Sequence, residues 1–312
     1  KMKILGVNFS HNCSFAYIEN NILKEYYEED RFNKEKNFRP PHPFFVSNYE
    51  YQVLKKFKNI TFDVVALSSS GKDNICYEKL FIDNILSQVK CNNVKFYNNQ
   101  HHIHHVVCGF YFSNFDKAIG VICDGAGERF NNHDKVHFRS VESIYEINKK
   151  EIKCFFQHFT NRDTDYFNIN EKIYREEKIK ENKIDLLLSN AVTGGAKYEK
   201  YRAEAGFSDH QEGQLMGIAA YKSKKTNLNK KVLEIANKAQ EETLEDRIKL
   251  IEKAITYSDC KNIILSGGYH LNCSNNFKLV KHFVGLNFFV DPIPYDGGTA
   301  VGAAYYCSNF EN

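Results

Sequence analysis

The stretch HHIHHVVCGFYFSNFDKAIGVICDGAGE, residues 101 to 128, combines four closely spaced histidines with an apolar strand and a glycine turn. HHIHHVVCGFYF is typical of a helix, and KAIGVICDG predicts a buried strand that ends in a turn. His101 and His105 are four positions apart, so on a helix they share a face and can both contact one ion. The histidines could instead lie on a solvated helix face or pack in a core.

Two aspartates stand where they could complete such a site. Asp124 ends the apolar strand, where a carboxylate is costly to bury without a partner and can face a cleft. Asp296, in PYDGGTAVG, precedes the last predicted helix. With His101 and His105 they form a mixed nitrogen and oxygen set suited to iron(II), manganese or zinc. Each aspartate could equally be a helix cap or a turn residue.

The alternation of predicted elements indicates two similar halves. Three strands open the chain, helices and strands then alternate, and a second cycle begins near Lys117. We expect an α/β fold of two lobes with mixed sheets flanked by helices, residues 1–115 forming the first lobe and residues 116–312 the second, around a shared cleft. Within this scheme, residues 46–57 and about 168–200 are expected to be helical.

The composition narrows the class of protein. The 312 residues are 42% hydrophobic and 26% charged, with a net charge of +3, so no global field favours nonspecific binding to nucleic acid or membranes. Nine cysteines occur without any CxxC pair, which argues against a disulfide framework or a zinc ribbon and indicates a reducing compartment. KMKILGVNFSHNC is a poor signal peptide, and no apolar run is long enough to span a membrane. We expect a cytoplasmic protein without a membrane partner.

Three glycine turns each follow a predicted strand. They are DGAGE (Asp124 to Glu128), SGGYHLN (Ser266 to Asn272) and DGGTAVG (Asp296 to Gly302). Glycine lets backbone amides approach a phosphate closely, and a helix start adds a favourable dipole. Neither a P-loop nor a GxGxxG motif after the first strand is present. The three turns together indicate a two-lobed fold that binds phosphate.

Other polar positions allow both a functional and a structural interpretation. Glu212 in EGQLMGIAAY could accept hydrogen bonds from ribose hydroxyls, or simply favour a helix N-terminus. His11 follows the first strand and could act as an acid or a base in the cleft, or it could cap the turn or pack against its neighbours. Arg31, Lys34 and Lys36 could contact an anionic substrate, although such charge runs usually form a solvated edge.

Taken in order, these motifs resemble those of the O-carbamoyltransferase family, which includes nodulation-factor, tobramycin and cephamycin carbamoyltransferases. The segments that carry the resemblance are GVNFSHNCSFAYIEN, EEDRFNKEK, the stretch quoted above, EGQLMGIAAY, LSGGYHLNCSNN and PYDGGTAVGAAYY. They span nearly the whole chain. The domain resembled is shared with the tRNA threonylcarbamoyl-transfer protein and implies an actin-like fold of the sugar kinase–chaperone–actin superfamily.

The resemblance implies a role for each motif. His101, His105, Asp124 and Asp296 would hold a divalent metal such as iron, which would bind the phosphate of carbamoyl-adenylate. Gly125, Ala126, Gly127, Gly267 and Gly268 would line the nucleotide, with Glu212 and Asn272 near the ribose and base. His11 and Lys36 would lie near the carbamoyl group and the acceptor. The acceptor hydroxyl would attack the carbamoyl carbon and expel AMP.

Two departures from the family pattern qualify these roles. Where the family often has His-Asp, this chain has His11-Asn12, so Asp209 or His11 would have to activate the acceptor. Full-length members also carry a C-terminal YrdC-like domain that makes carbamoyl-adenylate from ATP and carbamoyl phosphate. This sequence ends soon after the last helix motif, which implies a fragment, a separate YrdC-like partner protein, or another way of using carbamoyl phosphate.

The acceptor stays open at this stage. A sugar, a small metabolite, or a hydroxymethylated pyrimidine in a nucleotide or in DNA would each supply a hydroxyl. For DNA, KNFRPPHPFF (Lys36 to Phe45) could form a basic and aromatic groove, or an ordinary loop. Two other classes remain: a sugar-kinase-like phosphotransferase, which the paired histidines disfavour, and a non-catalytic or partner-dependent nucleotide-binding subunit.

Overall fold

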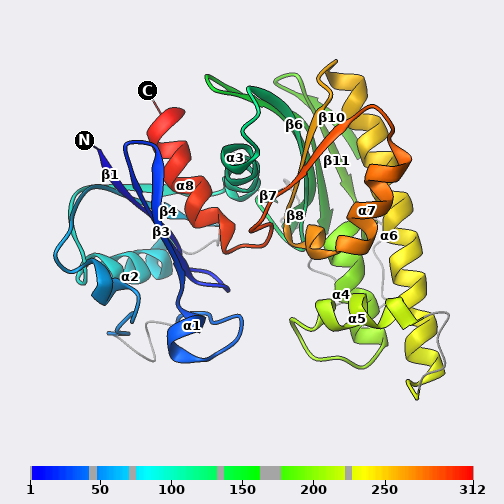
Figure 1. The fold of residues 1–312 in the computed structure, drawn as a ribbon, viewed down its shortest axis with the longest axis horizontal. Coiled ribbons are helices and arrows are strands. Elements are labelled where there is room, and N and C mark those ends of the chain that lie inside the picture. Colours follow the sequence, from blue (N-terminus) through cyan, green and yellow to red (C-terminus); the bar gives the residue numbers. More distant parts are fainter. Residues whose placement is uncertain are drawn as a thin grey trace.

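Two mixed β-sheets with the same central strand order form the framework of the protein (Figure 1). The computed structural model describes residues 2–41, 48–69, 75–131, 137–161, 177–221 and 227–311. The strands of the first sheet are β1 (Lys3–Asn8), β2 (Ser14–Glu19), β3 (Ile22–Glu28), β4 (Thr61–Ser68) and β5 (Lys90–Tyr97). They lie in the order β3-β2-β1-β4-β5, with β1, β4 and β5 parallel and β2 antiparallel to both of its neighbours.

The second sheet repeats this order and extends it. Its strands are β6 (Lys117–Cys123), β7 (Arg129–Asn131), β8 (His137–Asn148), β9 (Ile152–Asn161), β10 (Glu177–Glu181), β11 (Ile184–Ser189), β12 (Asn262–Ser266) and β13 (Asn287–Val290). The order β9-β8-β6-β12-β13 corresponds strand by strand to the first sheet. The hairpin β10–β11 is added beside β9, and β7 pairs with β8.

Helices fill the space between the sheets and cover their outer faces. They are α1 (Asp30–Asn33), α2 (Ile75–Leu86), α3 (His101–Ser113), α4 (Gly194–Glu204), α5 (Glu212–Ile218), α6 (Lys230–Tyr257), α7 (Cys273–His282) and α8 (Gly298–Asn309), with 3-10 turns η1 (Leu54–Phe57), η2 (Ala219–Tyr221) and η3 (Gly268–Leu271). In Figure 1, α3 and α8 lie between the two sheets, and α6 and α7 cover the far side of the second.

Small residues let α3 and α8 cross closely between the sheets. A Cβ atom on Gly302 of α8 would collide with the carbonyl oxygen of His104 in α3, and one on Gly6 of β1 would collide with Ala300 of α8. On the other side, a Cβ atom on Gly120 of β6 would collide with Val106 of α3. Apolar side chains from both helices and both sheets form one continuous core there. The first turn of α3 is thereby fixed between the two halves of the molecule.

The segment expected to be a helix over residues 46–57 is not one where the structure describes it. Residues 48–53 form turns and irregular backbone, and within the described part of this segment only η1 is helical. The buried carboxylate of Glu29 accepts hydrogen bonds from the backbone amides of Gln52 (2.6 Å) and Val53 (3.0 Å). Gln88 likewise accepts from the amide of Tyr51 at 2.9 Å. These tertiary contacts replace the bonds that a helix would make.

The expected helix over about 168–200 is also wrong in its central part. Residues 168–176 lie outside the described residues, and residues 177–189 form the hairpin β10–β11. Its turn has Asn182 and Lys183 at φ values of 49° and 71°, as tight hairpin turns require. Leu186 and Leu188 alternate into a small core and explain why β11 pairs with β9. Only α4 confirms the helical expectation, at its end.

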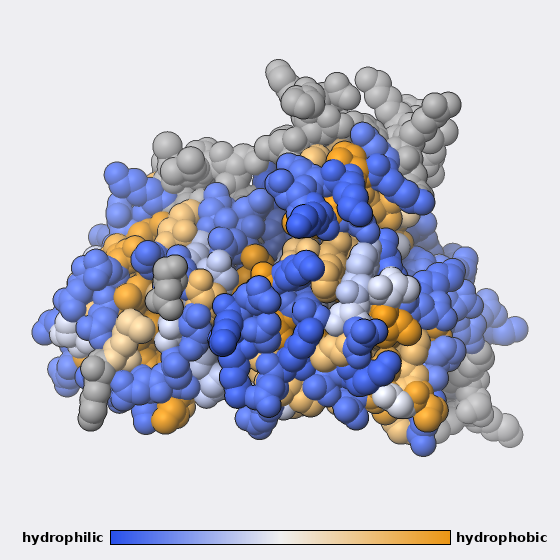
Figure 2. All heavy atoms as spheres, turned by 90° about the horizontal axis from the view of Figure 1, so that it is seen from above, coloured by the Kyte–Doolittle hydropathy of each residue, from blue (hydrophilic) through white to orange (hydrophobic). Residues whose placement is uncertain are grey.

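The expected fold class is confirmed: the chain is an α/β protein with two mixed sheets flanked by helices. Polar and charged residues cover much of the face shown in Figure 2, with apolar residues interspersed among them. Among the described residues, no helix combines the length and the apolar character that crossing a membrane requires.

Candidate functional site

The first turn of α3 presents two histidine rings to two carboxylates from other parts of the chain. His101 and His105 lie on one face of the helix, as their spacing predicts, and both rings are buried. Asp124 follows the end of β6, and Asp296 lies in the turn before α8. One ligand atom from each of the four residues lies within 4.8 Å of every other. The structure therefore brings the four predicted metal ligands together.

Within this cluster, His101 lies closer to the two carboxylates than His105 does. Its Nε2 atom lies 3.1 Å from Asp124 Oδ2, 3.4 Å from Asp296 Oδ1 and 3.1 Å from Nε2 of His105. The corresponding distances from His105 Nε2 to the two carboxylates are 3.8 and 3.9 Å. All four polar atoms thus face one small volume.

Neighbouring groups hold the carboxylates in place. The backbone amide of Gly268 donates to Asp124 Oδ1 at 3.2 Å. On the other side, Ser10 Oγ lies 3.3 Å from Asp296 Oδ2 and donates to it, and His11 Nδ1 approaches the same oxygen at 3.3 Å. The turn after β1 and the turn after β12 therefore meet at the cluster.

The other two histidines of the stretch serve the packing of α3. His104 Nδ1 lies 2.7 Å from the hydroxyl of Ser68 in β4, and His102 Nδ1 lies 2.7 Å from that of Ser143 in β8. Both rings are fully buried. Burial lowers the pKa of each, so both are neutral near pH 7. The stretch therefore contains two packing histidines between the two that face the carboxylates.

Burial and neighbouring charges shift the pKa values of His101 and His105 in opposite directions. Burial alone would lower the pKa of His101, but Asp296 and Asp124 outweigh it and raise the value to about 10. Burial and the charge on His101 lower the pKa of His105 to about 4. Against the effect of burial, the histidines hold the pKa of Asp124 well below its usual range. The protein on its own thus balances two carboxylates with a single imidazolium.

The donor set fits a divalent cation. Metal–nitrogen bonds of about 2.1 Å place adjacent ligand atoms roughly 3.0 to 3.4 Å apart, close to the 3.1 Å between the two Nε2 atoms. A divalent cation would balance the two carboxylates with both imidazoles neutral, which is the form that binds metal. Imidazole and carboxylate together suit iron(II), manganese and zinc, so the residues do not select among these ions.

A cleft of about 790 Å³ opens beside the cluster. Asp124 and Asp296 line it, whereas His101 and His105 lie behind them with less than 3% of their surface exposed. The predicted site residues that line the cleft are His11, Arg31, Lys36, Asp124, Gly125, Ala126, Asp209, Glu212, Gly268 and Asp296. Residues from both halves of the chain therefore share this cleft.

Two predicted nucleotide-binding glycines lie behind the cleft wall. A Cβ atom on Gly127 would collide with His102 and Ser140, and its amide donates to the carbonyl of Ser140 at 2.7 Å. Gly267 has a φ of 93°, and a Cβ atom there would collide with the backbone of Cys123. Both glycines permit close packing beneath the loops that carry Gly125 and Gly268.

Asn272 is occupied by contacts within the protein. Its Oδ1 atom accepts from the amide of Asn275 at 3.1 Å and thus caps α7. Its Nδ2 atom donates to the hydroxyl of Tyr198 at 3.0 Å, and Gln240 exchanges two further bonds with the same amide. Only 3% of Asn272 is exposed. The structure places it in a buried network below the cleft.

Asp209 and Glu212 share one partner, Arg202 of α4. Its Nη2 atom lies 2.8 Å from Asp209 Oδ1, and its Nε atom lies 2.9 Å from Glu212 Oε1. The side chain of Asp209 is 84% exposed, whereas that of Glu212 is 25% exposed. Lys36 is exposed and reaches the cleft from the segment after α1.

Sequence patterns missed several residues of the cleft. His210 lies between Asp209 and Glu212, and its ring stacks on that of His11 with centroids 5.4 Å apart. Glu28, only 6% exposed, accepts from the hydroxyls of Tyr26 (2.9 Å) and Tyr295. In the sequence, only the neighbouring Asp209 pointed to His210. No local pattern links His210 with His11, because the two residues are about two hundred positions apart.

The fold is similar to that of several solved structures. Full-length HypF in the phosphate- and nucleotide-bound form aligns with a TM-score of 0.59 and 14% identity, over 98% of this chain and 55% of HypF. HypF from T. kodakarensis gives 0.53 and 12%, over 100% and 49% of the two chains. A ROK family protein from Streptococcus pneumoniae TIGR4, in complex with sucrose, gives 0.52 and 11%, over 98% of both. These similarities confirm the actin-like fold.

Sequence comparison gives the family. The uncharacterized protein sll1178 of Synechocystis sp. (strain ATCC 27184 / PCC 6803 / Kazusa) is 22% identical over 351 residues, covering 96% of this chain and 56% of that protein. The chain therefore spans about half the length of this relative, as it does with HypF. The family model described as Carbamoyltransferase N-terminus matches residues 16–305. The chain thus belongs to the carbamoyltransferase N-terminus family.

Proposed function

We propose that this chain transfers a carbamoyl group from carbamoyl-adenylate to the hydroxyl of an acceptor, as an O-carbamoyltransferase. The observation that carries the proposal is the cluster of His101, His105, Asp124 and Asp296 at the wall of a cleft, in a chain of this family. The acceptor is a sugar, a metabolite or a hydroxymethylated pyrimidine in a nucleotide or nucleic acid.

The four clustered residues would hold a divalent cation, iron(II), manganese or zinc. Bound there, the cation would supply positive charge beside the phosphate of the donor, where negative charge develops as AMP leaves. Asp124 and Asp296 both line the cleft, so a ligand in the cleft could reach the cation from their side. The amide of Gly268 would keep Asp124 oriented toward it.

The glycine turns and α5 would bind the nucleotide. Gly125, Ala126 and Gly268 line the cleft with little or no side chain, which permits close approach of a ligand to the backbone. Glu212 borders the same cleft at the start of α5, and its pairing with Arg202 fixes its carboxylate. That carboxylate would accept from ribose hydroxyls, whereas Gly127, Gly267 and Asn272 would support the nucleotide site from behind.

His11 would accept the proton of the acceptor. Because Nδ1 of His11 faces Asp296, Nε2 is the ring nitrogen left for a ligand. The acceptor oxygen would bond to the carbamoyl carbon, the bond from that carbon to the phosphate oxygen would break, and AMP would leave with the electron pair. The hydroxyl proton would pass to His11, and the cation Lys36 would offset negative charge at the cleft.

The donor would be made from ATP and carbamoyl phosphate, by this chain or by a separate YrdC-like partner. Of the stretch KNFRPPHPFF, which could form a groove for DNA, residues 42–45 lie outside the described part of the chain.

The two alternative functions predict different results. A sugar-kinase-like phosphotransferase would need carboxylates with magnesium, and the two imidazoles facing the cluster argue against it. A non-catalytic nucleotide-binding subunit would bind carbamoyl-adenylate without converting it. Turnover of preformed carbamoyl-adenylate would therefore distinguish the proposed function from both alternatives.

The test follows AMP release from preformed carbamoyl-adenylate by the full chain loaded with iron(II) or manganese, with and without a panel of hydroxylated acceptors. We expect acceptor-dependent AMP release and a carbamoylated product by mass spectrometry. His11→Gln should abolish transfer, whereas His282→Ala, at an exposed histidine of α7, should not. Binding without release would contradict the proposal in favour of the non-catalytic subunit.

A parallel reaction with ATP and carbamoyl phosphate locates the first half-reaction. Pyrophosphate release by the chain alone would show that it makes its own donor. Transfer from preformed carbamoyl-adenylate without pyrophosphate release would assign donor synthesis to a partner.

A further inference from the structure

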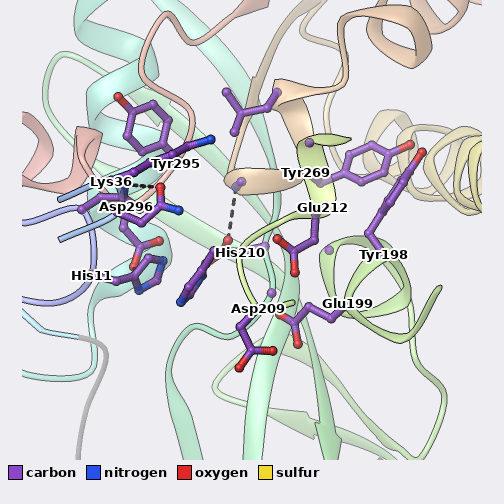
Figure 3. Close-up of a pocket in the computed structure, with 18 of the residues that line it drawn as sticks. His11, Lys36, Tyr198, Glu199, Asp209, His210, Glu212, Tyr269, Tyr295 and Asp296 are labelled. Carbon is purple, nitrogen blue, oxygen red and sulfur yellow. Dashed lines mark hydrogen bonds and ion pairs between the residues drawn. The ribbon is translucent and has the colours of Figure 1, made fainter. Parts of the chain in front are cut away.

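Two imidazole rings from distant parts of the chain stack against each other in the cleft. His11 lies in the turn between β1 and β2, and His210 lies in the loop between α4 and α5. Their centroids are 5.4 Å apart and their planes differ by 28°, so the rings are nearly parallel. Figure 3 shows them side by side, with Asp296 beside His11. The contact joins the two walls of the cleft.

The loop that carries His210 is held firmly to α4. Arg202 binds the carboxylates of Asp209 and Glu212, the residues on either side of the His210–Gln211 pair. Its Nη1 atom also donates to the carbonyl of Phe207 at 3.0 Å. One guanidinium thus fixes the loop at three points, which defines where His210 enters the cleft.

His210 has a backbone conformation that is unfavourable for most side chains. Its φ is 63°, in the left-handed region where residues other than glycine are uncommon. Such conformations persist only where the surroundings impose them, and they concentrate at functional sites. Here the left-handed turn places the ring over His11.

The rest of His11 is fixed by contacts on its own side of the cleft. Nδ1 lies 3.3 Å from Asp296 Oδ2, and the side-chain amide of Asn8 donates to the carbonyl of His11 at 3.1 Å. Partial desolvation and the neighbouring His11 lower the pKa of His210, so its ring is neutral near pH 7. His210 therefore covers one face of a ring whose backbone and Nδ1 are already held.

We propose that His210 is a positioning residue that holds the ring of His11 in the orientation needed to take the acceptor's proton. This role rests on the proposed function. The imidazole acts through its aromatic face and not through its nitrogens, so another flat ring can replace it. Asp209, its neighbour, contributes by anchoring the loop to Arg202.

The experiment compares His210→Ala with His210→Phe, using His282→Ala as the control at an exposed histidine. The proteins carry ¹³C-labelled histidine, and His11→Gln identifies the His11 resonances. Loss of the stacked ring should move the His11 ring-proton resonances in His210→Ala, whereas His210→Phe should retain a ring-current shift. Metal content should stay at the wild-type level in both.

Transfer from carbamoyl-adenylate provides the second measurement. We expect kcat to fall about 10- to 100-fold in His210→Ala, with the KM for carbamoyl-adenylate little changed, because misplaced catalytic groups cost rate without weakening donor binding. His210→Phe should recover most of the loss.

Each of the two measurements can contradict the positioning role independently of the other. Unchanged His11 resonances in His210→Ala would overturn the positioning role. A His210→Phe protein that keeps the ring-current shift but is as slow as His210→Ala would also overturn it, by assigning the effect to the nitrogens. A wild-type protein that transfers nothing would contradict the proposed function, and the resonances would still show whether the ring pair exists.

Discussion

The Nε2 atoms of His101 and His105 face each other at 3.1 Å, and both point at the same two carboxylates. Two imidazole nitrogens can approach this closely if one carries a proton, as the raised pKa of His101 and the lowered pKa of His105 provide, or if both bind a cation. The short distance between the two rings is therefore compatible with a single proton on His101 when no metal is bound and with two neutral rings when a cation is bound.

Removing one of these imidazoles should remove the metal without unfolding the protein. We expect His105→Gln to lower the affinity for iron(II), manganese or zinc by at least about 10-fold. Removing a metal ligand should cost more affinity than removing a hydrogen-bond partner of a ligand, which typically costs about that much. Competition with a chelator, followed by elemental analysis, measures the change. His282→Ala should retain wild-type affinity. Equal metal content in His105→Gln and the wild type would exclude this cluster as the metal site.

The crossing of α3 and α8 makes a second prediction. Gly302→Ala would drive a methyl group into the carbonyl of His104, so α8 and α3 must separate. We expect a loss of about 1–3 kcal/mol in the free energy of unfolding, together with weaker metal binding because α3 carries His101 and His105. Urea denaturation and the chelator titration measure the two effects.

Gly217→Ala is the matched control for this substitution. Gly217 is exposed in α5, and apart from its chain neighbours and the backbone of its own helix no described atom lies within 4 Å of the position that its Cβ would take. Alanine is favoured over glycine in a helix, so this variant should gain about 0.5–1 kcal/mol. A Gly302→Ala protein as stable as Gly217→Ala would contradict the close crossing.

Local sequence signals predicted those parts of the structure that depend on spacing and hydrophobic pattern. The four-residue spacing of His101 and His105 indicated one helix face, and the apolar run before Asp124 indicated a buried strand. Two cycles of strands and helices indicated two similar halves, although the order of the strands within each sheet was not predicted. Each of these features is determined within about one turn or one strand.

Features that depend on tertiary contacts were not accessible in this way. Gly125 and Gly127 are equivalent in the motif DGAGE, yet one lines the cleft and the other packs on His102, because the loop turns between them. Tyr51 and Gln52 carry helical periodicity, but Glu29 and Gln88 bind their amides. His210 belongs to the site only through His11, about two hundred residues away.

A buried ion pair beneath α4 gives a third prediction. Arg247 is fully buried, bonds to Glu142, and lies over the ring of Tyr269 with 5.3 Å to its centroid. Arg247→Met would leave the buried carboxylate of Glu142 without its guanidinium partner, although Nδ1 of His158 would still lie 3.2 Å away. We expect a loss of about 3–5 kcal/mol in the free energy of unfolding.

A double-mutant cycle tests whether this loss comes from the stranded charge. Glu142→Gln with Arg247→Met should be less destabilised than the sum of the two single variants, with a coupling of about 1–3 kcal/mol. Lys149→Met, which removes an exposed partner of Asp116, should leave stability nearly unchanged. Strictly additive losses at Glu142 and Arg247 would show that the pair does not interact as the structure indicates.

Asp291, which directly follows β13, should make the free energy of unfolding depend on pH. The carboxyl is 2% exposed and accepts from Ser266 Oγ at 2.7 Å and from the amide of Ile293 at 2.9 Å, with the thiol of Cys108 at 3.6 Å. Burial outweighs these bonds and raises its pKa to about 6. The folded protein therefore binds this proton more tightly than the unfolded chain does.

The sign of the effect follows from that difference. A raised folded-state pKa gives stability that is complete below the unfolded value, near 4, and is lost as the pH rises through about 6. Between pH 5 and pH 8 the wild type should lose about 1.4 kcal/mol through this group. Asp291→Asn cannot titrate, so urea unfolding at the two pH values should show a difference smaller by about that amount. If the two proteins respond equally to pH, the Asp291 carboxyl is already ionised in the folded state at pH 5, and burial does not control its protonation.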